Sequence, residues 1–288
     1  MFSTLVSTAA LAGMLDDPAL VLCDVRHDLA RPEAWGEDQF RAGHIPGARF
    51  VHLDRMLSGP KTGTNGRHPL PTPEFAAAQF AQLGIAADRQ VVIYDQGPGM
   101  YASRMWWMLQ WLGHDAVAVL DGGYAKWSAE KRPVSATATR YAPAAFAIRK
   151  VTPHVNASGV RASLARRTLL LVDARAPERF RGETEPLDPV AGHIPGAHNR
   201  PYTLNLDPAG TFKSPAVLRG EFEVLLAGAK HDVVVHSCGS GVTACHNILA
   251  MEVAGLAGTR LYPGSWSEWC ADPLRPVAQG DDNTASER

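Results

Sequence analysis

The chain has 288 residues, 45% of them hydrophobic, which is enough to bury the cores of two ordinary domains. Its 28 lysines and arginines nearly balance 29 aspartates and glutamates, and this net charge of −1 argues against nucleic acid as a partner and favours a small-molecule substrate. No run approaches the roughly 18 apolar residues that cross a bilayer, and no basic residue of a secretory signal precedes Arg26. We therefore expect a soluble, cytoplasmic protein with no membrane partner.

The first predicted strand, at residues 20–25, opens a pattern that the second half of the chain repeats. Leu20-Val-Leu-Cys-Asp-Val-Arg26 returns as Leu169-Leu-Leu-Val-Asp-Ala-Arg175. Ala42-Gly-His-Ile-Pro-Gly-Ala48 returns at the same spacing as Ala191-Gly-His-Ile-Pro-Gly-Ala197. Two segments that recur in one register indicate an internal duplication.

Each copy alternates short β-branched runs with helical stretches, which is typical of a parallel sheet covered by helices on both faces. We predict an α/β protein of two similar domains, at residues 1–139 and 155–278. An Ala-, Thr- and Pro-rich stretch at 140–154 is predicted to link them over the surface, and the polar residues 279–288 are predicted to form a flexible tail.

The first copy contains a glycine loop, Gly97-Pro-Gly-Met-Tyr-Ala102, between a predicted strand and a predicted helix. This loop fits the G-x-G-x-x-A pattern of dinucleotide-binding proteins, and Asp121 follows at a suitable spacing. However, Pro98 lacks the N–H group that a pyrophosphate would bind, and the loop lies late in its unit. A dinucleotide cofactor is therefore the less favoured interpretation.

The corresponding loop of the second copy contains a cysteine. A predicted strand at residues 232–237 leads into Cys238, and a helical pattern begins at Cys245. The glycines let successive backbone N–H groups face one point, and the helix dipole adds positive potential there, so a thiolate is favoured over a thiol. Cys238 is thus a candidate nucleophile. The loop residues expected to bind the substrate beside it are Gly239, Gly241, Val242 and Thr243.

Other cysteine chemistries fit less well. Cysteine phosphatases need an arginine six residues after the cysteine, where this chain has Ala244. A cysteine protease would need a histidine base, and His236 has Tyr94 as its counterpart in the first copy, which favours a structural role. Cys23 is expected to be an inert core residue, because Val172 takes its place in the other copy.

Several motifs together resemble the tandem rhodanese family: Cys238-Gly-Ser-Gly-Val-Thr-Ala244, the two Gly-His-Ile-Pro-Gly-Ala segments, Asp173-Ala-Arg175 and Gly264-Ser-Trp-Ser-Glu-Trp269. The resemblance implies two rhodanese-like domains and a persulfide on Cys238. The sulfur would pass to cyanide or to a thiol, such as that of a thioredoxin-like protein, with no metal or organic cofactor. The first copy has Gln96 in place of Cys238 and is expected to be inactive. A persulfide-sensing or scaffold protein is the non-enzymatic alternative.

The resemblance also bears on the sulfur donor. Arg179 matches the family's substrate-binding arginine, and a neutral Gly-Ser-Gly after the cysteine is similar to members that prefer 3-mercaptopyruvate. Thiosulfate is the alternative donor, because the second arginine common in mercaptopyruvate enzymes is replaced by Leu187. Arg200 is a candidate substitute for that arginine.

A Ser-His-Asp relay is implied by the same resemblance. It would consist of Ser240 from the second copy with His68 and Asp54 from the first. A hydroxyl backed by an imidazole can protonate a leaving enolate or polarise the donor. A structural histidine within a Gly- and Pro-rich loop is the alternative role for His68.

Overall fold

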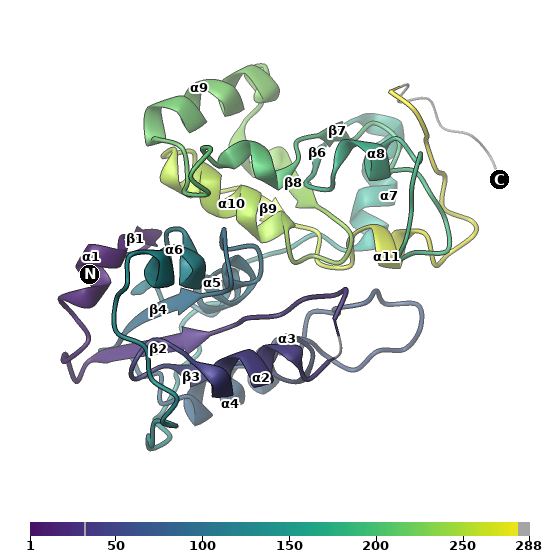
Figure 1. Cartoon of the computed structure of the whole chain (residues 1–288). Coiled ribbons are helices and arrows are strands. Elements are labelled where there is room, and N and C mark those ends of the chain that lie inside the picture. The colour runs from purple at the N-terminus through teal and green to yellow at the C-terminus, as the bar shows by residue number, and fades with distance from the viewer. Residues whose placement is uncertain (32, 282–288) are drawn as a thin grey trace. The chain divides into compact units, whose positions relative to one another are not determined.

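The computed structural model describes residues 1–31 and 33–281 (Figure 1). They form two compact units: residues 1–59, 71–152 and 207–212 make the first, and residues 60–70, 153–206 and the chain from 213 onward make the second. Most of the predicted tail, residues 282–288, lies outside the described residues. Within the described part of the chain, no helix is both long enough and apolar enough to cross a bilayer.

The first unit contains a five-stranded parallel sheet in the order β1-β5-β4-β2-β3. Its strands are β1 (Leu5–Val6), β2 (Leu20–Asp24), β3 (Arg49–Phe50), β4 (Gln90–Tyr94) and β5 (Val117–Leu120). Its helices are α1 (Thr8–Ala12), α2 (Trp35–Ala42), α3 (Leu53–Met56), α4 (Pro73–Gln82), α5 (Ala102–Trp111) and α6 (Gly123–Ala129). Apolar side chains of the strands pack with Trp127 in a core.

The second unit contains a four-stranded parallel sheet in the order β7-β6-β8-β9. Its strands are β6 (Leu170–Asp173), β7 (His198–Asn199), β8 (Val234–Ser237) and β9 (Arg260–Leu261). Its helices are α7 (Ala157–Arg166), α8 (Pro177–Phe180), η1 (Tyr202–Asn205), α9 (Pro215–Leu226), η2 (His231–Val233), α10 (Ala244–Val253) and α11 (Ser265–Trp269). The sequence predicts a strand from residue 232, but η2 occupies its first two positions and β8 begins at Val234.

The two units repeat a buried ion pair at the end of an equivalent strand. Arg26 donates to the carboxylate of Asp24 at 2.7 Å in the first unit, and Arg175 does the same to Asp173 at 2.7 Å in the second. Each guanidinium also donates to a backbone carbonyl of the Gly-His-Ile-Pro-Gly-Ala segment in its own unit, that of Gly43 or Gly192. The pairs therefore fasten that segment to the sheet, in agreement with the duplication.

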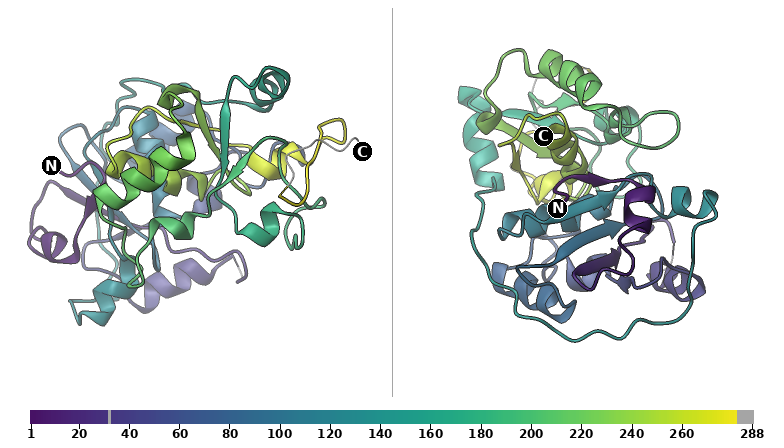
Figure 2. Two further views of the ribbon diagram at one scale, coloured as in Figure 1. Left: turned by 90° about the horizontal axis from the view of Figure 1, so that it is seen from above. Right: turned by 90° about the vertical axis from the view of Figure 1, so that its left-hand side faces the viewer.

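Residues 140–152, called the strap below, are an extended segment of the first unit (Figure 2). The Ala144 N–H donates to the carbonyl of Ala81 at 2.9 Å, and the Phe146 ring lies 5.2 Å from the Phe80 ring. The strap thus binds along the C-terminal end of α4. Residues 140–152, predicted as part of a linker, thus belong to the first unit.

Residues 60–70, called the arm below, lie in the first copy by sequence but pack within the second unit. Gly66 has a φ of +90°, and a Cβ there would lie 3.0 Å from the carbonyl oxygen of Gly264, so a glycine allows this close approach. The neighbouring Arg67 N–H donates to Ser267 Oγ at 3.1 Å. The arm therefore departs from the predicted domain at 1–139 and brings its side chains to α11.

Candidate active site

Cys238 lies between β8 and α10 of the second unit, as the sequence predicts (Figure 1). Its side chain is buried, with 2% of the residue exposed. The loop turns sharply at Gly241, where φ is +74° and a Cβ would lie 2.2 Å from the carbonyl oxygen of Pro263. Only glycine fits at this position, so the tight path from strand to helix depends on it.

The turn before α11 fixes the backbone of the cysteine loop. Ser265 Oγ accepts the Cys238 N–H at 3.0 Å, and the Trp266 N–H donates to the Cys238 carbonyl at 3.0 Å. The Ser267 N–H donates to the Gly239 carbonyl at 2.9 Å. Ser265 takes a φ of +53°, a strained conformation for a residue with a side chain, and these bonds hold it. The Gly264-Ser-Trp-Ser-Glu-Trp269 motif therefore supports the loop.

The equivalent loop of the first unit reveals what such a backbone can bind. The buried carboxylate of Asp95 accepts four backbone N–H groups at 2.8 to 3.2 Å. These donors are Gly97, Gly99, Tyr101 and Ala102. Burial raises the pKa of Asp95, while the four N–H groups oppose that shift. The loop is thus an anion-binding nest, filled in the first unit by its own side chain.

The backbone hydrogen bonds place Asp95, and not Gln96, at the position of Cys238. The Tyr94 carbonyl accepts the Val25 N–H as the Ser237 carbonyl accepts the Ala174 N–H, and the Asp95 carbonyl accepts the Tyr124 N–H as the Cys238 carbonyl accepts the Trp266 N–H. In the second unit the internal carboxylate is thus replaced by the thiol itself, which corrects the alignment of Gln96 with Cys238.

From Gly99 and Gly241 onward the two loops match residue for residue, so the residues that correspond to the donors Gly99, Tyr101 and Ala102 are Gly241, Thr243 and Ala244. Val242 lies between two of them and is buried. A nest of this form, at the N-terminus of the ten-residue helix α10, suits an anionic sulfur of Cys238.

Arg179, predicted to bind an anion, lies against the cysteine loop. It is on the short helix α8, and its guanidinium nitrogens would lie 3.6 and 3.7 Å from a Cβ on Gly239. Its Nη2 atom pairs with Glu185 Oε1 at 2.6 Å, and 18% of its side chain is exposed. The structure therefore brings Arg179 next to Gly239, the residue that follows Cys238.

A second guanidinium at the same point was not predicted from the sequence. Arg67, carried by the arm, places its Nη2 atom 2.8 Å from the position of a Cβ on Gly239. Its Nη1 atom pairs with Asp188. The sequence holds one clue to Arg67, its position directly before His68, but the folding of the arm onto the second unit was needed to show its place.

Two buried carboxylates hold these arginines. Asp188 lies between them, paired with Arg67 and 3.5 Å from Arg179 Nη2, while Glu185 pairs with Arg179. Burial raises the pKa of Asp188, and the Arg67 guanidinium opposes this shift. Leu187, where an arginine was missing from the expected pattern, is exposed. Arg67 thus supplies a cation that the sequence pattern lacks.

His68 and Ser240, two members of the predicted relay, are in contact. His68 Nδ1 lies 2.7 Å from Ser240 Oγ, and both residues are buried within the second unit. Asp54, the third member, lies on α3 of the first unit and is partly buried. Its part in the relay stays a prediction.

Arg200, predicted as a possible ligand of the anion, is bonded elsewhere. Its Nη2 atom pairs with Glu221 at 2.7 Å and donates to Asn205 Oδ1 at 3.1 Å, and its guanidinium lies 4.2 Å above the Phe222 ring. These contacts tie the chain after β7 to α9. The geometry thus gives Arg200 a structural role and does not support its inclusion among the anion-binding residues.

The remaining candidate nucleophiles and bases have unsuitable surroundings. Burial lowers the pKa of His236 to about 3, with a contribution from Arg200, so this imidazole stays neutral near pH 7. Burial raises the pKa of Cys23 to about 12, which keeps it a thiol. Cys245 and Cys270 are also buried. Cys238 is the cysteine that lies in the loop beside two guanidiniums.

The comparisons with known proteins agree with this architecture. The model of the rhodanese-like domain matches residues 7–130 and again residues 156–272. The chain therefore belongs to the rhodanese-like family, with two such domains, and it is an enzyme of the sulfurtransferase class.

Individual relatives span almost the entire chain. A protein of Pseudomonas aeruginosa named "Probable 3-mercaptopyruvate sulfurtransferase" is 46% identical over 96% of this chain and 98% of its own length. The rat 3-mercaptopyruvate sulfurtransferase is 35% identical over 99% of this chain and 98% of its own length. The crystal structure of SseA from Escherichia coli is 32% identical, has a TM-score of 0.79, and is matched over 93% of this chain and 100% of that one.

Proposed function

We propose that the enzyme transfers sulfur from 3-mercaptopyruvate to cyanide or a thiol through a persulfide on Cys238. The observation that carries this proposal is the position of Cys238 in an anion-binding loop, with the guanidiniums of Arg67 and Arg179 next to Gly239. A thiolate, a nest of N–H groups and two cations suit an acidic thiol as the sulfur donor.

In the first half-reaction, the Cys238 thiolate attacks the sulfur of 3-mercaptopyruvate. A bond forms between the two sulfur atoms while the carbon–sulfur bond of the donor breaks, and its electron pair stays on carbon as the enolate of pyruvate. The thiol proton of the donor is transferred to that carbon. The products are pyruvate and the anionic persulfide, so charge and atoms balance.

The Ser240 hydroxyl is suited to assist this step. Hydrogen-bonded to His68 at 2.7 Å, it can donate to the carbonyl oxygen of the donor, where negative charge develops as the enolate forms. His68 can replace the proton that Ser240 gives up, and that proton returns by the same path when the enol takes up the thiol proton on carbon and becomes the ketone of pyruvate. Asp54 is proposed to orient the imidazole, as the family resemblance implies.

The second half-reaction returns the enzyme to its starting state. Cyanide or an acceptor thiolate attacks the outer sulfur of the persulfide, and the sulfur–sulfur bond breaks with its electrons returning to Cys238. The products are thiocyanate or a persulfide of the acceptor. A thioredoxin-like dithiol is a suitable acceptor because it can release the sulfur by forming its own disulfide. The four free cysteines fit a reducing compartment, and we propose the cytoplasm.

Thiosulfate is the second candidate donor, because two guanidiniums lie beside Gly239 although the loop itself is neutral. Their charge is offset, however, by Glu185 and Asp188, which pair with Arg179 and Arg67. Because the fixed charge beside the loop is therefore close to zero, a bound dianion is stabilised there less than a monoanionic acid that also offers a carbonyl to Ser240. Steady-state rates with each donor, with cyanide as acceptor, test this choice. A higher kcat/KM for thiosulfate would contradict it.

A further inference from the structure

Ser265 has a backbone conformation that its place in the chain does not explain. Its φ is +53°, and the residue is fully buried. Three other non-glycine residues in the described part of the chain have a positive φ, and each lies at or just after the C-terminal end of a helix: Lys131, Arg167 and Ala227. The left-handed conformation is common at such ends. Ser265 instead begins α11, so its unfavourable conformation needs another reason.

The first unit has a glycine at the equivalent position. Helices α6 and α11 correspond, because the N–H of the second residue of each donates to the carbonyl of Asp95 or Cys238. The first residues of these helices are Gly123, with a φ of +58°, and Ser265. Glycine adopts this conformation at little cost. The turn therefore forms without a side chain, and the serine adds a group that the turn itself does not require.

The length of the preceding loop decides whether a side chain fits at this position. In the first unit, a Cβ on Gly123 would lie 2.2 Å from the carbonyl oxygen of Gly97. This loop, residues 95–99, is one residue longer than its counterpart at residues 238–241. The shorter cysteine loop accommodates the side chain of Ser265. The shorter loop and the serine are therefore linked features of the second unit.

The Ser265 hydroxyl is bonded to Cys238 itself. Its Oγ atom accepts the Cys238 N–H at 3.0 Å and donates to the Tyr262 carbonyl at 2.9 Å. A hydroxyl that donates to one group and accepts from another is held in one orientation. It therefore fixes the backbone of Cys238, and the direction of the Cys238 side chain follows from that backbone.

We propose that Ser265 is a positioning residue, whose hydroxyl holds the Cys238 sulfur at the place from which it attacks the donor. A strained serine is retained in the turn because this hydroxyl is needed. Misplacing a reacting atom by about 1 Å can lower a rate by about a hundredfold. Donor binding depends instead on Arg67 and Arg179, so the effect of Ser265 falls on kcat and not on KM. The inference rests on the proposed role of Cys238 as the nucleophile.

Two substitutions separate the hydroxyl from the backbone conformation. Ser265→Gly removes the whole side chain and restores the residue that the first unit uses in this turn. Ser265→Ala removes only the hydroxyl and keeps the Cβ. Both variants should lower kcat with 3-mercaptopyruvate by about tenfold and keep KM within about twofold of wild type, because both lack the hydroxyl.

The reaction of Cys238 with iodoacetamide tests the positioning without a sulfur donor. A sulfur displaced from the N–H groups of the nest is less well stabilised as a thiolate, which is the reactive form. The rate constant for alkylation of Cys238 at pH 7, followed by peptide mapping, should fall about threefold or more in both variants. This measurement does not depend on sulfur transfer, so it tests the role of Ser265 even if the proposed function is wrong.

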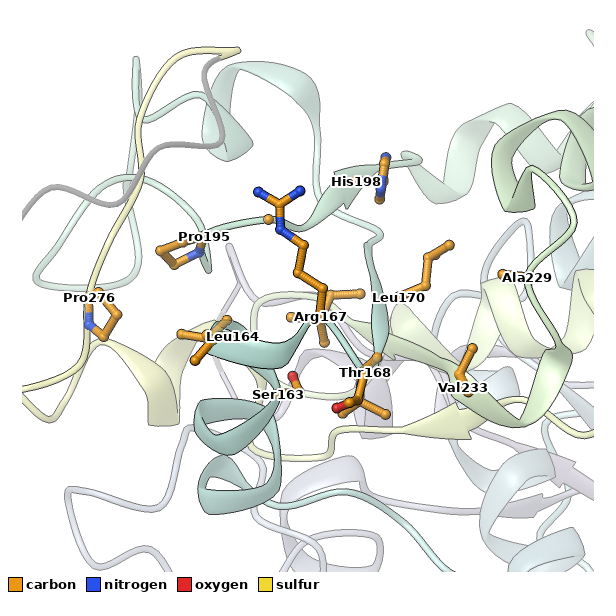
Figure 3. A pocket seen from close by; sticks show the side chains of 14 residues that line it. Ser163, Leu164, Arg167, Thr168, Leu170, Pro195, His198, Ala229, Val233 and Pro276 are labelled. Atoms are coloured by element: carbon orange, nitrogen blue, oxygen red, sulfur yellow. The ribbon is translucent and has the colours of Figure 1, made fainter.

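Ser163 provides a matched control in the same unit. It is also buried, and its Oγ atom donates to a carbonyl three residues earlier, that of Val160 at 2.8 Å, as the Ser265 hydroxyl does. Ser163 lies on α7 beside a cavity of about 670 Å³ that Arg167 also lines (Figure 3). Ser163→Ala removes a similar hydroxyl from another part of the unit. It should leave kcat and the alkylation rate within about twofold of wild type.

Several results would overturn the proposal. If Ser265→Gly keeps kcat and the alkylation rate within about twofold of wild type, the hydroxyl has no role in positioning. A raised KM with an unchanged kcat would assign Ser265 to donor binding instead. An equal loss in Ser163→Ala would mean that any buried hydroxyl has this effect. Unfolding of Ser265→Gly would also contradict the proposal, because the turn at Gly123 forms with glycine.

Discussion

His68 Nδ1 lies 2.7 Å from Ser240 Oγ, although 172 residues separate the two along the chain. The contact exists because the arm, residues 60–70, packs within the second unit. It joins a residue of the first sequence copy to the loop that carries Cys238. A hydroxyl held by an imidazole at this place can act on a substrate bound to the loop.

The relay predicts a loss of activity that depends on the donor. Ser240→Ala should lower kcat with 3-mercaptopyruvate by about 10²-fold, since general acid catalysis contributes about 10²- to 10⁴-fold. The rate with thiosulfate should fall much less, because sulfite leaves without forming an enolate oxygen to which Ser240 could donate. Steady-state kinetics with both donors measure the difference. Equal losses for the two donors would assign Ser240 a structural role in the loop.

The two guanidiniums beside Gly239 predict that Arg179 and Arg67 each contribute to donor binding. Arg179→Ala and Arg67→Ala should each lower kcat/KM for 3-mercaptopyruvate by roughly one to two orders of magnitude, the scale of a lost charge-assisted hydrogen bond of about 1.5–3 kcal/mol. Arg181→Ala is the matched control, because Arg181 pairs with Glu183 at the surface. A kcat/KM within about twofold of wild type for either active-site variant would remove that residue from donor binding.

The first-unit loop should stay inactive even with a cysteine. In a Cys238→Ser background, Gln96→Cys should gain no sulfur from 3-mercaptopyruvate, because the Asp95 carboxylate already occupies the N–H groups of the nest. A thiolate there would also meet a like charge. Intact-mass spectrometry after donor treatment is the readout. Sulfur on the introduced thiol would show that Asp95 does not block the nest.

Gly241 should be required for the shape of the cysteine loop. Gly241→Ala combines a φ of +74° with a Cβ placed 2.2 Å from the Pro263 carbonyl oxygen, so we expect a loss of more than about 1–3 kcal/mol of unfolding free energy. Gly258→Ala is the control, because it shares a positive φ but has no atom near the added Cβ. Denaturant unfolding of both variants measures the effect. Equal losses would mean that the close contact with Pro263 is unimportant.

The sequence predicted the features that recur in both copies and those that involve residues close together along the chain. Two segments that recur at the same spacing predicted the duplication, and the glycines between a predicted strand and a predicted helix predicted the position of Cys238. Arg179 could be expected next to the loop from the family resemblance. The carboxylate of Asp95 was overlooked because alignment on the glycines placed Gln96 at the position of Cys238, whereas the backbone hydrogen bonds place Asp95 there.

Contacts between distant segments could not be predicted in this way. Arg67 lies beside Gly239 because of how the arm folds, which no local pattern encodes. The ion pair between Arg200 and Glu221, which lies on α9, is also a contact that the local sequence does not indicate. Its atoms are 2.7 Å apart, and it offsets the charge that made Arg200 a candidate anion ligand.

The persulfide on Cys238 is the central claim, and mass spectrometry of the enzyme after treatment with 3-mercaptopyruvate tests it most directly. The wild-type protein should gain the mass of one sulfur atom, located by peptide mapping at Cys238 and removed by cyanide. The Cys238→Ser variant should stay folded, gain no sulfur and show no turnover, because a hydroxyl neither ionises near neutral pH nor holds a persulfide. Sulfur found on Cys245 or Cys270 instead, or turnover by the Cys238→Ser variant, would contradict the account.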